Sequence, residues 1–224
     1  MYKRHSSLKN QFEKQQAEWG NIHAMEVPLH FDSHQSESTS MRDLAICDVS
    51  SLPKLGVKGR GAAAWLSGEG IPIPNGIYEW LPFDQGAMII RLAPDEFFLE
   101  DTMGGEWVAN LSGRLGRGFD GVYRVERQDT GLLISGKRSH EVLAQTCSYP
   151  FDDSEEKVVM TRVALVSCSI LPLLLKEVQT FRLWFSSTYG IYLWQSLTEI
   201  VEDLGGKTVG VKVYFKNRIY IKVK

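Results

Sequence analysis

The chain has 224 residues, enough for one α+β domain or for two small lobes that pack together. Apolar residues make up 43% of it, so it can bury a sizeable core, and a formal net charge of −2 gives no general attraction to nucleic acid or to an anionic membrane. No apolar run has the length of a membrane span, and the N-terminus lacks the apolar segment of a secretory signal. We therefore expect a globular protein with neither a nucleic-acid nor a membrane partner.

Three cysteines, Cys47, Cys147 and Cys168, are scattered among mostly apolar neighbours. Their number is odd, and no pair has the spacing of metal ligands. Four of the five histidines lie in the first 40 residues at irregular spacing, which also argues against a metal site. We expect reduced structural thiols, a cytoplasmic location and no metal centre.

Residues 1–40 are polar and weakly periodic, which predicts a solvated N-terminal arm, with 34–40 as a loop. Apolar residues within it, such as Trp19 and Phe31, indicate that the arm packs on its own domain or on a partner. A first α+β lobe follows over 41–121. It is expected to contain strands over 44–49 and 54–58, a short helix over 59–67, a hairpin over 86–100 and a mobile glycine-rich linker over 101–121.

A second α+β lobe, expected over 122–206, repeats this order of elements. It contains strands, a helix over 136–146, more strands, and a longer helix over 187–204. The apolar residues of that last helix recur at spacings of three and four, which predicts one buried face made by Ile191, Trp194, Leu197, Val201 and Leu204.

The two lobes share a glycine turn, which indicates an internal repeat. Gly59 and Gly136 each follow a strand, and a leucine comes seven residues after each of them. An Arg-Leu pair later opens a strand in each half, at Arg91 and at Arg182. Glycine suits a strand-to-helix turn in which backbones approach closely. The fold class we predict is α+β, with duplicated strand-helix-strand units and antiparallel sheets.

Residues 207–224 form a basic tail with six positive charges and no acid. Apolar and polar residues alternate on both sides of Lys216-Asn217, which predicts a β-hairpin. Its lysines either protect an edge strand from aggregation or provide a docking surface for an acidic partner.

Four motifs occur in an order that resembles a known family. Residues 45–50 are Ala-Ile-Cys-Asp-Val-Ser and precede a strand that ends at Gly59; residues 91–99 read Arg-Leu-Ala-Pro-Asp-Glu-Phe-Phe-Leu. The segment 131–143 ends in Val-Leu, and Phe181-Arg-Leu precedes a helix with Leu-Trp-Gln-Ser-Leu at 193–197. Over roughly 43–204 this resembles the glycine-cleavage T-protein family, whose folate-binding fold the resemblance implies here. The short length and the missing C-terminal barrel domain point to the branch of the sarcosine oxidase gamma subunit.

The resemblance also allows the family's functional positions to be compared with this chain. Two aspartates that handle protons in one-carbon transfer to tetrahydrofolate fall on Gln85 and Gly86, and neither residue can act as a general base. The glutamate that binds the pterin ring falls on Val178. The neighbouring acids Asp84 and Glu177 are the remaining candidates for cofactor binding, and we assign no catalytic residue.

Other candidate motifs have a structural explanation. Gly113 to Gly118 superficially resembles a dinucleotide loop but has the wrong spacing, although Arg114 and Arg117 could meet a carboxylate or a phosphate. Consecutive helix residues do not face one another, so Ser139-His140-Glu141 is not a nucleophile site. The aromatic cluster over 78–83 is expected to face a partner.

Two functions follow from the resemblance. The first is a non-catalytic accessory subunit, of the gamma type, in a heterotetrameric flavin-dependent oxidase of sarcosine or another secondary amine. FAD, FMN and NAD would then lie on larger alpha- and beta-like flavoprotein subunits. The alternative is a stand-alone aminomethyltransferase-like protein that binds tetrahydrofolate through Asp84 or Glu177. Whether the isolated chain forms a homo-oligomer stays open.

Overall fold

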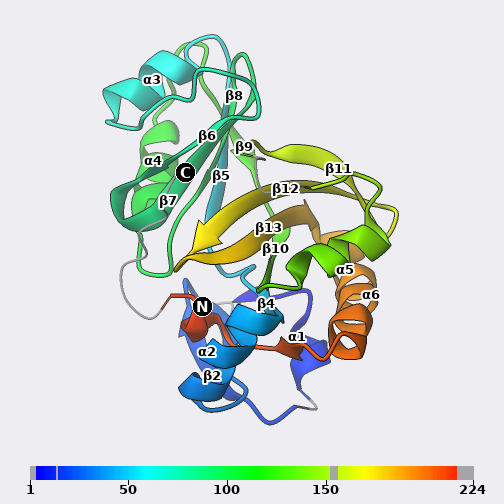
Figure 1. The fold of residues 1–224 in the computed structure, drawn as a ribbon. Helices are drawn as coiled ribbons and strands as arrows, with labels where there is room; N and C mark the ends of the chain where they lie inside the picture. The colour runs from blue at the N-terminus through cyan, green and yellow to red at the C-terminus, as the bar shows by residue number, and fades with distance from the viewer. Residues whose placement is uncertain (1–3, 14, 152–155, 216–224) are drawn as a thin grey trace. The chain divides into compact units, whose positions relative to one another are not determined.

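The computed structural model describes residues 4–13, 15–151 and 156–215. Spatial contacts divide the chain into two compact units (Figure 1). Unit 1 combines Met1–Ser51 with Asp129–Lys224, and unit 2 is the continuous segment Leu52–Gln128. The division therefore differs from the lobes expected at 41–121 and 122–206, because the first strand of the expected first lobe belongs to the sheet of unit 1.

Unit 2 contains a five-stranded sheet, sheet C, with two helices against one of its faces. Its strands lie in the order β6-β7-β8-β5-β9. In chain order the elements are β5 (Lys54–Lys58), α3 (Ala62–Gly68), β6 (Trp80–Phe83), the 3-10 turn η1 (Asp84–Gly86), β7 (Ala87–Ala93), β8 (Glu96–Glu100), α4 (Trp107–Leu115) and β9 (Tyr123–Glu126). Leu55, Val57 and Leu99 of the sheet form one core with Leu66 of α3 and Leu111 of α4.

Unit 1 contains a six-stranded sheet, sheet B, in the order β11-β12-β13-β10-β4-β14. Its elements are β4 (Ala45–Asp48), β10 (Asp129–Ser135), α5 (Ser139–Thr146), β11 (Val159–Val163), β12 (Val166–Leu175), β13 (Val178–Ser186), η2 (Ser187–Tyr189), α6 (Gly190–Asp203), β14 (Lys207–Thr208) and η3 (Val211–Val213). Ile46, Ile134 and Phe181 pack with Leu143 of α5 and Trp194 of α6 into its core. Ile191, expected on this buried face of α6, is 45% exposed instead.

The same strand order occurs in both sheets, which confirms the α+β fold class with a duplicated unit. β5, β6, β7, β8 and β9 of sheet C correspond to β10, β11, β12, β13 and β4 of sheet B. The repeat includes an exchange of strands: β4 leads along the chain into β5 but pairs with β10, whereas β9 leads into β10 but pairs with β5. Arg91 and Arg182 are not equivalent, since Arg91 lies on β7 and Arg182 on β13, the counterpart of β8.

The N-terminal residues belong to the core of unit 1, not to a solvated arm. They form β1 (Arg4–His5), α1 (Lys9–Phe12), β2 (Glu18–Ile22) and β3 (Met25–His30), and then α2 (His34–Asp43) where a loop was expected. Leu8 and Phe12 are fully buried. The carboxylate of Glu37, itself 2% exposed, accepts from the backbone N–H groups of Phe31 and Gly210, each at 2.8 Å. One buried acid thus joins the first and last described segments of unit 1.

Two further expectations were wrong. The stretch 101–121 was expected to be a mobile linker but contains α4, whose Val108, Leu111 and Leu115 are buried. The basic tail does not begin with a hairpin strand: β14 pairs in parallel with β4, and Val211–Val213 form a short 3-10 turn. Val213 and Tyr214 are buried, and the tyrosine hydroxyl lies 2.6 Å from Ser135 Oγ. Residues 216–224 lie outside the described part of the chain.

The longest helix of the described residues, α6, has 14 residues. Within that part of the chain, no helix is both long and apolar enough to cross a membrane.

Candidate functional site

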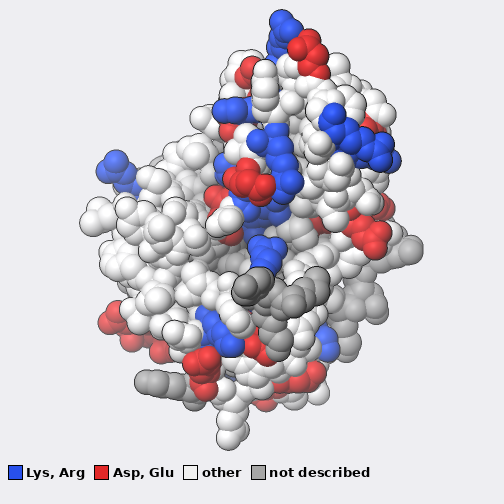
Figure 2. All heavy atoms as spheres, turned by 180° about the vertical axis from the view of Figure 1, so that it is seen from behind, with Lys and Arg blue, Asp and Glu red and all other residues white. Residues whose placement is uncertain are grey.

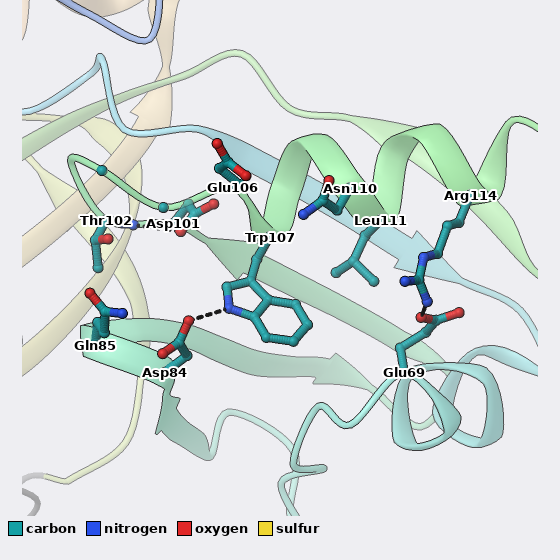
Figure 3. A pocket seen from close by; sticks show the side chains of 12 residues that line it. Glu69, Asp84, Gln85, Asp101, Thr102, Glu106, Trp107, Asn110, Leu111 and Arg114 are labelled. Carbon is teal, nitrogen blue, oxygen red and sulfur yellow. Dashed lines mark hydrogen bonds and ion pairs between the residues drawn. The ribbon is translucent and has the colours of Figure 1, made fainter.

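A hollow of about 440 Å³ lies within unit 2, between the β6–β7 turn, the N-terminal turns of α4 and the end of α3 (Figure 3). Residues from these three places, from the loop between β8 and α4 and from the last turn of α4 line it: Glu69, Asp84, Gln85, Asp101, Thr102, Gly104, Gly105, Glu106, Trp107, Asn110, Leu111 and Arg114. Its volume is in the range of small-molecule sites.

Asp101 shapes the inner wall of the hollow by capping α4. Its side chain is buried, and Oδ2 accepts from the backbone N–H of Val108 at 3.1 Å. A carboxylate at this place satisfies one of the N–H groups that a helix start leaves open and complements the helix dipole. The close approach requires glycine at position 105, since a Cβ there would lie 1.6 Å from Asp101 Oδ1. The local sequence Asp-Thr-Met-Gly-Gly therefore starts a helix instead of forming a linker.

Trp107 and Asp84 form the second wall. The indole N–H of Trp107 donates to Asp84 Oδ2 at 2.7 Å (Figure 3). The ring also packs edge-on against Phe83, with 5.7 Å between the ring centroids. Asp84, Gln85 and Gly86 all have positive φ, at 20°, 46° and 99°. Glycine tolerates this conformation best, so the turn itself accounts for Gly86, at one of the two positions where the resemblance led us to expect a carboxylate.

The far end of the hollow is closed by an ion pair between Arg114 and Glu69 (Figure 3). The sequence indicated that Arg114 could bind a carboxylate, and the carboxylate that it binds is Glu69 of the same unit. The lining thus holds four carboxylates and one guanidinium. Asp101 and Glu69 have partners inside the wall, and the net negative charge favours a cation over an anion.

The two candidate residues from the sequence have different surroundings. Asp84 lines the hollow together with Gln85. Glu177 belongs to unit 1, in the two-residue turn between β12 and β13, where Lys176 and Glu177 have φ values of 51° and 64°. These values fit a tight hairpin turn, which explains both residues without a binding role. Val178 begins β13 and pairs with Leu175.

The remaining candidate motifs have structural roles in the described residues. Ser139 Oγ donates to the carbonyl of Gly136 at 2.7 Å, and the ring of His140 packs edge-on against Phe181 at 4.9 Å. Burial raises the pKa of the Cys47 thiol and raises that of Cys168 to about 12. A thiol with a raised pKa is a poor nucleophile at neutral pH.

The Asp48 motif, one of the four that suggested the fold, also has a structural explanation. Asp48 Oδ1 accepts from the backbone N–H of Ser50 at 2.9 Å, and Oδ2 accepts from Ser6 Oγ. Ser50 Oγ in turn accepts from the N–H of Gly131 at 3.1 Å. The motif therefore fixes the end of β4 to β10 and to the N-terminal segment.

Most residues that line the hollow could not be recognised from the sequence. Asp101, Trp107 and Asn110 lie in the stretch 101–121, whose six glycines had predicted a linker. The signal that could have identified them is the apolar spacing of Val108, Leu111 and Leu115, which is helical.

No group of three or more His, Cys, Asp or Glu side chains in the described part of the chain could hold a metal ion. On the face drawn in Figure 2, basic and acidic side chains are interspersed. Neither observation points to a metal centre or to an extended surface for a polyanion.

Comparisons with known proteins provide structural similarity only. No family model and no curated protein matches the chain. Its fold is similar to glycine cleavage system aminomethyltransferase T from Bartonella henselae, with a TM-score of 0.75 and 18% identity over 96% of this chain and 62% of that chain. It is also similar to a chain of heterotetrameric sarcosine oxidase from Corynebacterium sp. U-96, with a TM-score of 0.60 and 16% identity over 77% of this chain and 93% of that one. The chain thus spans about three fifths of the T-protein and has a T-protein-like fold.

Proposed function

We propose that this chain is a non-catalytic accessory subunit, of the gamma type, of a flavin-dependent oxidase that acts on sarcosine or another secondary amine. The observation that carries the proposal is the β6–β7 turn. Gln85 and Gly86 stand there in place of two carboxylates, and the φ of 99° at Gly86 favours glycine over any acid.

The similarity to the sarcosine oxidase chain supports the same proposal. The alignment covers 77% of this chain but 93% of that one, so the matched chain is shorter than this one. This chain is therefore comparable to a small subunit of that assembly. In the proposed complex the larger alpha- and beta-like subunits hold FAD, FMN and NAD, and this chain contributes an interface. We place the complex in the cytoplasm, as the sequence predicts.

Co-expression tests the proposal. Any flavoprotein whose gene lies beside that of this chain would be co-expressed with it, and the mixture would be purified through a tag on this chain alone. The proposal expects flavin absorbance to elute with this chain at a fixed ratio. Elution of this chain as a flavin-free species, with a folded flavoprotein in the unbound fraction, contradicts it.

The second candidate is a tetrahydrofolate-binding, aminomethyltransferase-like protein. It is favoured by the alignment of 96% of this chain with aminomethyltransferase T and by Asp84 in the wall of the hollow. A saturating ligand at 100 times its dissociation constant adds about 2.7 kcal/mol to the unfolding free energy. A rise of the melting temperature with tetrahydrofolate, lost in Asp84→Asn and kept in Glu177→Gln, would favour this candidate over the first.

A further inference from the structure

The elements around the hollow of unit 2 are repeated in unit 1, where two of them are in direct contact. The N–H of Ala164, in the β11–β12 turn, donates to the carbonyl of Thr146 at the end of α5 at 2.8 Å. Thr146 corresponds to Glu69, since each lies ten residues after its repeated glycine, Gly136 or Gly59. In unit 2 no backbone hydrogen bond of the described residues joins the β6–β7 turn to Glu69, and the hollow lies between them.

A longer connection in unit 2 provides the inner wall of the hollow. Residues 101–106 join β8 to α4, whereas 187–189 join β13 to α6 at the equivalent place. The longer loop leads into Trp107, which lies at the centre of the side chains drawn in Figure 3. A Cβ on Gly104 of this loop would have no atom within 4 Å, so the loop leaves space beside it. The hollow is therefore made by residues that unit 2 has in addition to the repeat.

The four carboxylates of the lining differ in what neutralises them. Glu69 pairs with Arg114, and Asp101 binds the backbone N–H groups at the start of α4. Asp84 accepts only an indole N–H, and Glu106 makes no side-chain bond to the helix; neither forms an ion pair with a described cationic residue. Because Asp101 already occupies the positive end of the helix dipole, that dipole does not offset the two remaining charges. A bound cation would.

The aromatic and apolar part of the wall favours an organic cation over a metal ion. The hydrogen bond to Asp84 and the edge-on contact with Phe83 hold the indole ring of Trp107 in place, and Leu111 lines the hollow beside it. The face of an indole attracts a cation, most strongly one with a weakly hydrated, alkylated nitrogen. The described residues contain no cluster of metal ligands, and about 440 Å³ suits a small molecule.

We propose that the hollow of unit 2 binds a small organic ammonium ion, whose charge is balanced by Asp84 and Glu106 and whose alkyl groups contact Trp107 and Leu111. Such a ligand differs from tetrahydrofolate in the sign of its charge, because tetrahydrofolate carries carboxylates. The inference stands on the lining of the hollow, so it holds or fails independently of the proposed oxidase complex.

The test uses the full isotope-labelled chain and tert-butylammonium chloride as the probe. The probe is added up to about 10 mM, where a site with a dissociation constant near 1 mM is mostly filled. It replaces sodium chloride mole for mole, so that the ionic strength and the screening of charges stay constant. The signal is the indole N–H resonance of Trp107, assigned by its loss in Trp107→Phe. We expect a saturable shift of this resonance.

Matched controls separate charge from shape. The neutral compound tert-butanol has nearly the same shape and leaves the protein unchanged, and it should give no saturable shift over the same range. Asp84→Asn keeps an acceptor for the indole N–H but removes one charge, which should weaken binding of the probe about fivefold. Asp95→Asn makes the same change at an exposed position in the β7–β8 turn, outside the hollow, and should leave the affinity unchanged. A melting curve shows that each variant folds.

Three results would overturn the proposal. The first is a Trp107 resonance that does not shift, or that shifts without saturation. The second is an equal, saturable shift with tert-butanol, which would make the hollow a site for neutral apolar molecules. The third is equal affinity of the probe for Asp84→Asn and Asp95→Asn, which would show that the carboxylate of the hollow does not recognise the cation.

Discussion

Gly59 and Gly136 occupy the same turn in the two halves of the molecule, with φ values of 114° and 112°. Each approaches the backbone that enters the exchanged strand: a Cβ on Gly59 would lie 2.3 Å from the carbonyl oxygen of Gly121, and one on Gly136 would lie 2.5 Å from that of Asp43. The hydrogen bonds agree, because Gly61 N donates to Gly121 O at 3.0 Å and Arg138 N to Asp43 O at 3.2 Å. The repeat is thus preserved at the level of single backbone atoms.

Alanine at either repeated glycine should destabilise the protein. A non-glycine residue at such φ costs on the order of 1–3 kcal/mol, and the contact with a backbone oxygen adds to it. Gly59→Ala and Gly136→Ala should both lower the urea midpoint. Gly68→Ala is the control: it lies in α3 with open space around it, so it should leave the midpoint unchanged or raise it. Equal midpoints for all three variants would contradict the role of the turn.

The ion pair between Lys54 and Glu100 is buried, with side chains 3% and 2% exposed and a separation of 3.7 Å. Removing one member leaves the other charge buried, which typically costs about 3–5 kcal/mol. Lys54→Met should therefore lower the unfolding free energy by several times more than Arg60→Ala. Arg60 pairs with Asp120 at the surface, and loss of such a pair costs about 1 kcal/mol or less. Chemical denaturation of both variants measures the contrast.

Asp101 should stabilise α4 and with it the wall of the hollow. Asp101→Ala removes the acceptor of the Val108 N–H, and loss of a helix cap costs about 0.5–2 kcal/mol. Glu106→Ala is the control, because Glu106 precedes the helix but makes no side-chain bond to its end. Hydrogen exchange at Val108 should rise in the first variant only. A similar rise in both would show that the cap is not specific to Asp101.

Alkaline pH should destabilise the protein through groups whose pKa burial raises. The Cys168 thiol has its pKa raised from an ordinary value of 9.0 to about 12, and burial also raises the pKa of Cys47 and of the Tyr214 phenol. Above pH 9 the unfolded chain loses the Cys168 proton before the folded chain does, so the unfolding free energy falls as pH rises from 9 toward 12. Cys168→Ala should reduce that slope relative to the parent chain. An unchanged slope would mean that Cys168 does not contribute.

The sequence predicted the features that depend on neighbouring residues. The turn at Gly59 and Gly136 was visible because strand, glycine and helix follow one another directly. The strand exchange was not, since pairing of β4 with β10 joins residues that lie far apart in the sequence. Pairing over such separations depends on tertiary packing, which local propensity does not encode.

Helix α2 shows why the composition of residues 34–40 wrongly predicted a loop. Serine and threonine disfavour helix interiors because their hydroxyls compete for backbone groups. Here the hydroxyls of Ser38, Thr39 and Ser40 donate to the carbonyls four residues earlier, and Ser33 caps the start by accepting from the N–H of Ser36 at 3.3 Å. These hydroxyl groups form hydrogen bonds with backbone groups of α2 and do not interrupt the helix. Similarly, Asp101 in the hollow caps the start of α4, but the glycines around it had predicted a linker instead of a helix.

The most direct measurement of the proposed function is sedimentation velocity of the purified chain mixed with a purified candidate flavoprotein from a neighbouring gene, followed in the flavin absorbance band. The account predicts that the flavin boundary moves to a faster-sedimenting species when this chain is added, and that tetrahydrofolate leaves the melting temperature of the isolated chain unchanged. A flavin boundary that does not change, together with a melting temperature that rises with tetrahydrofolate, would contradict the accessory-subunit assignment.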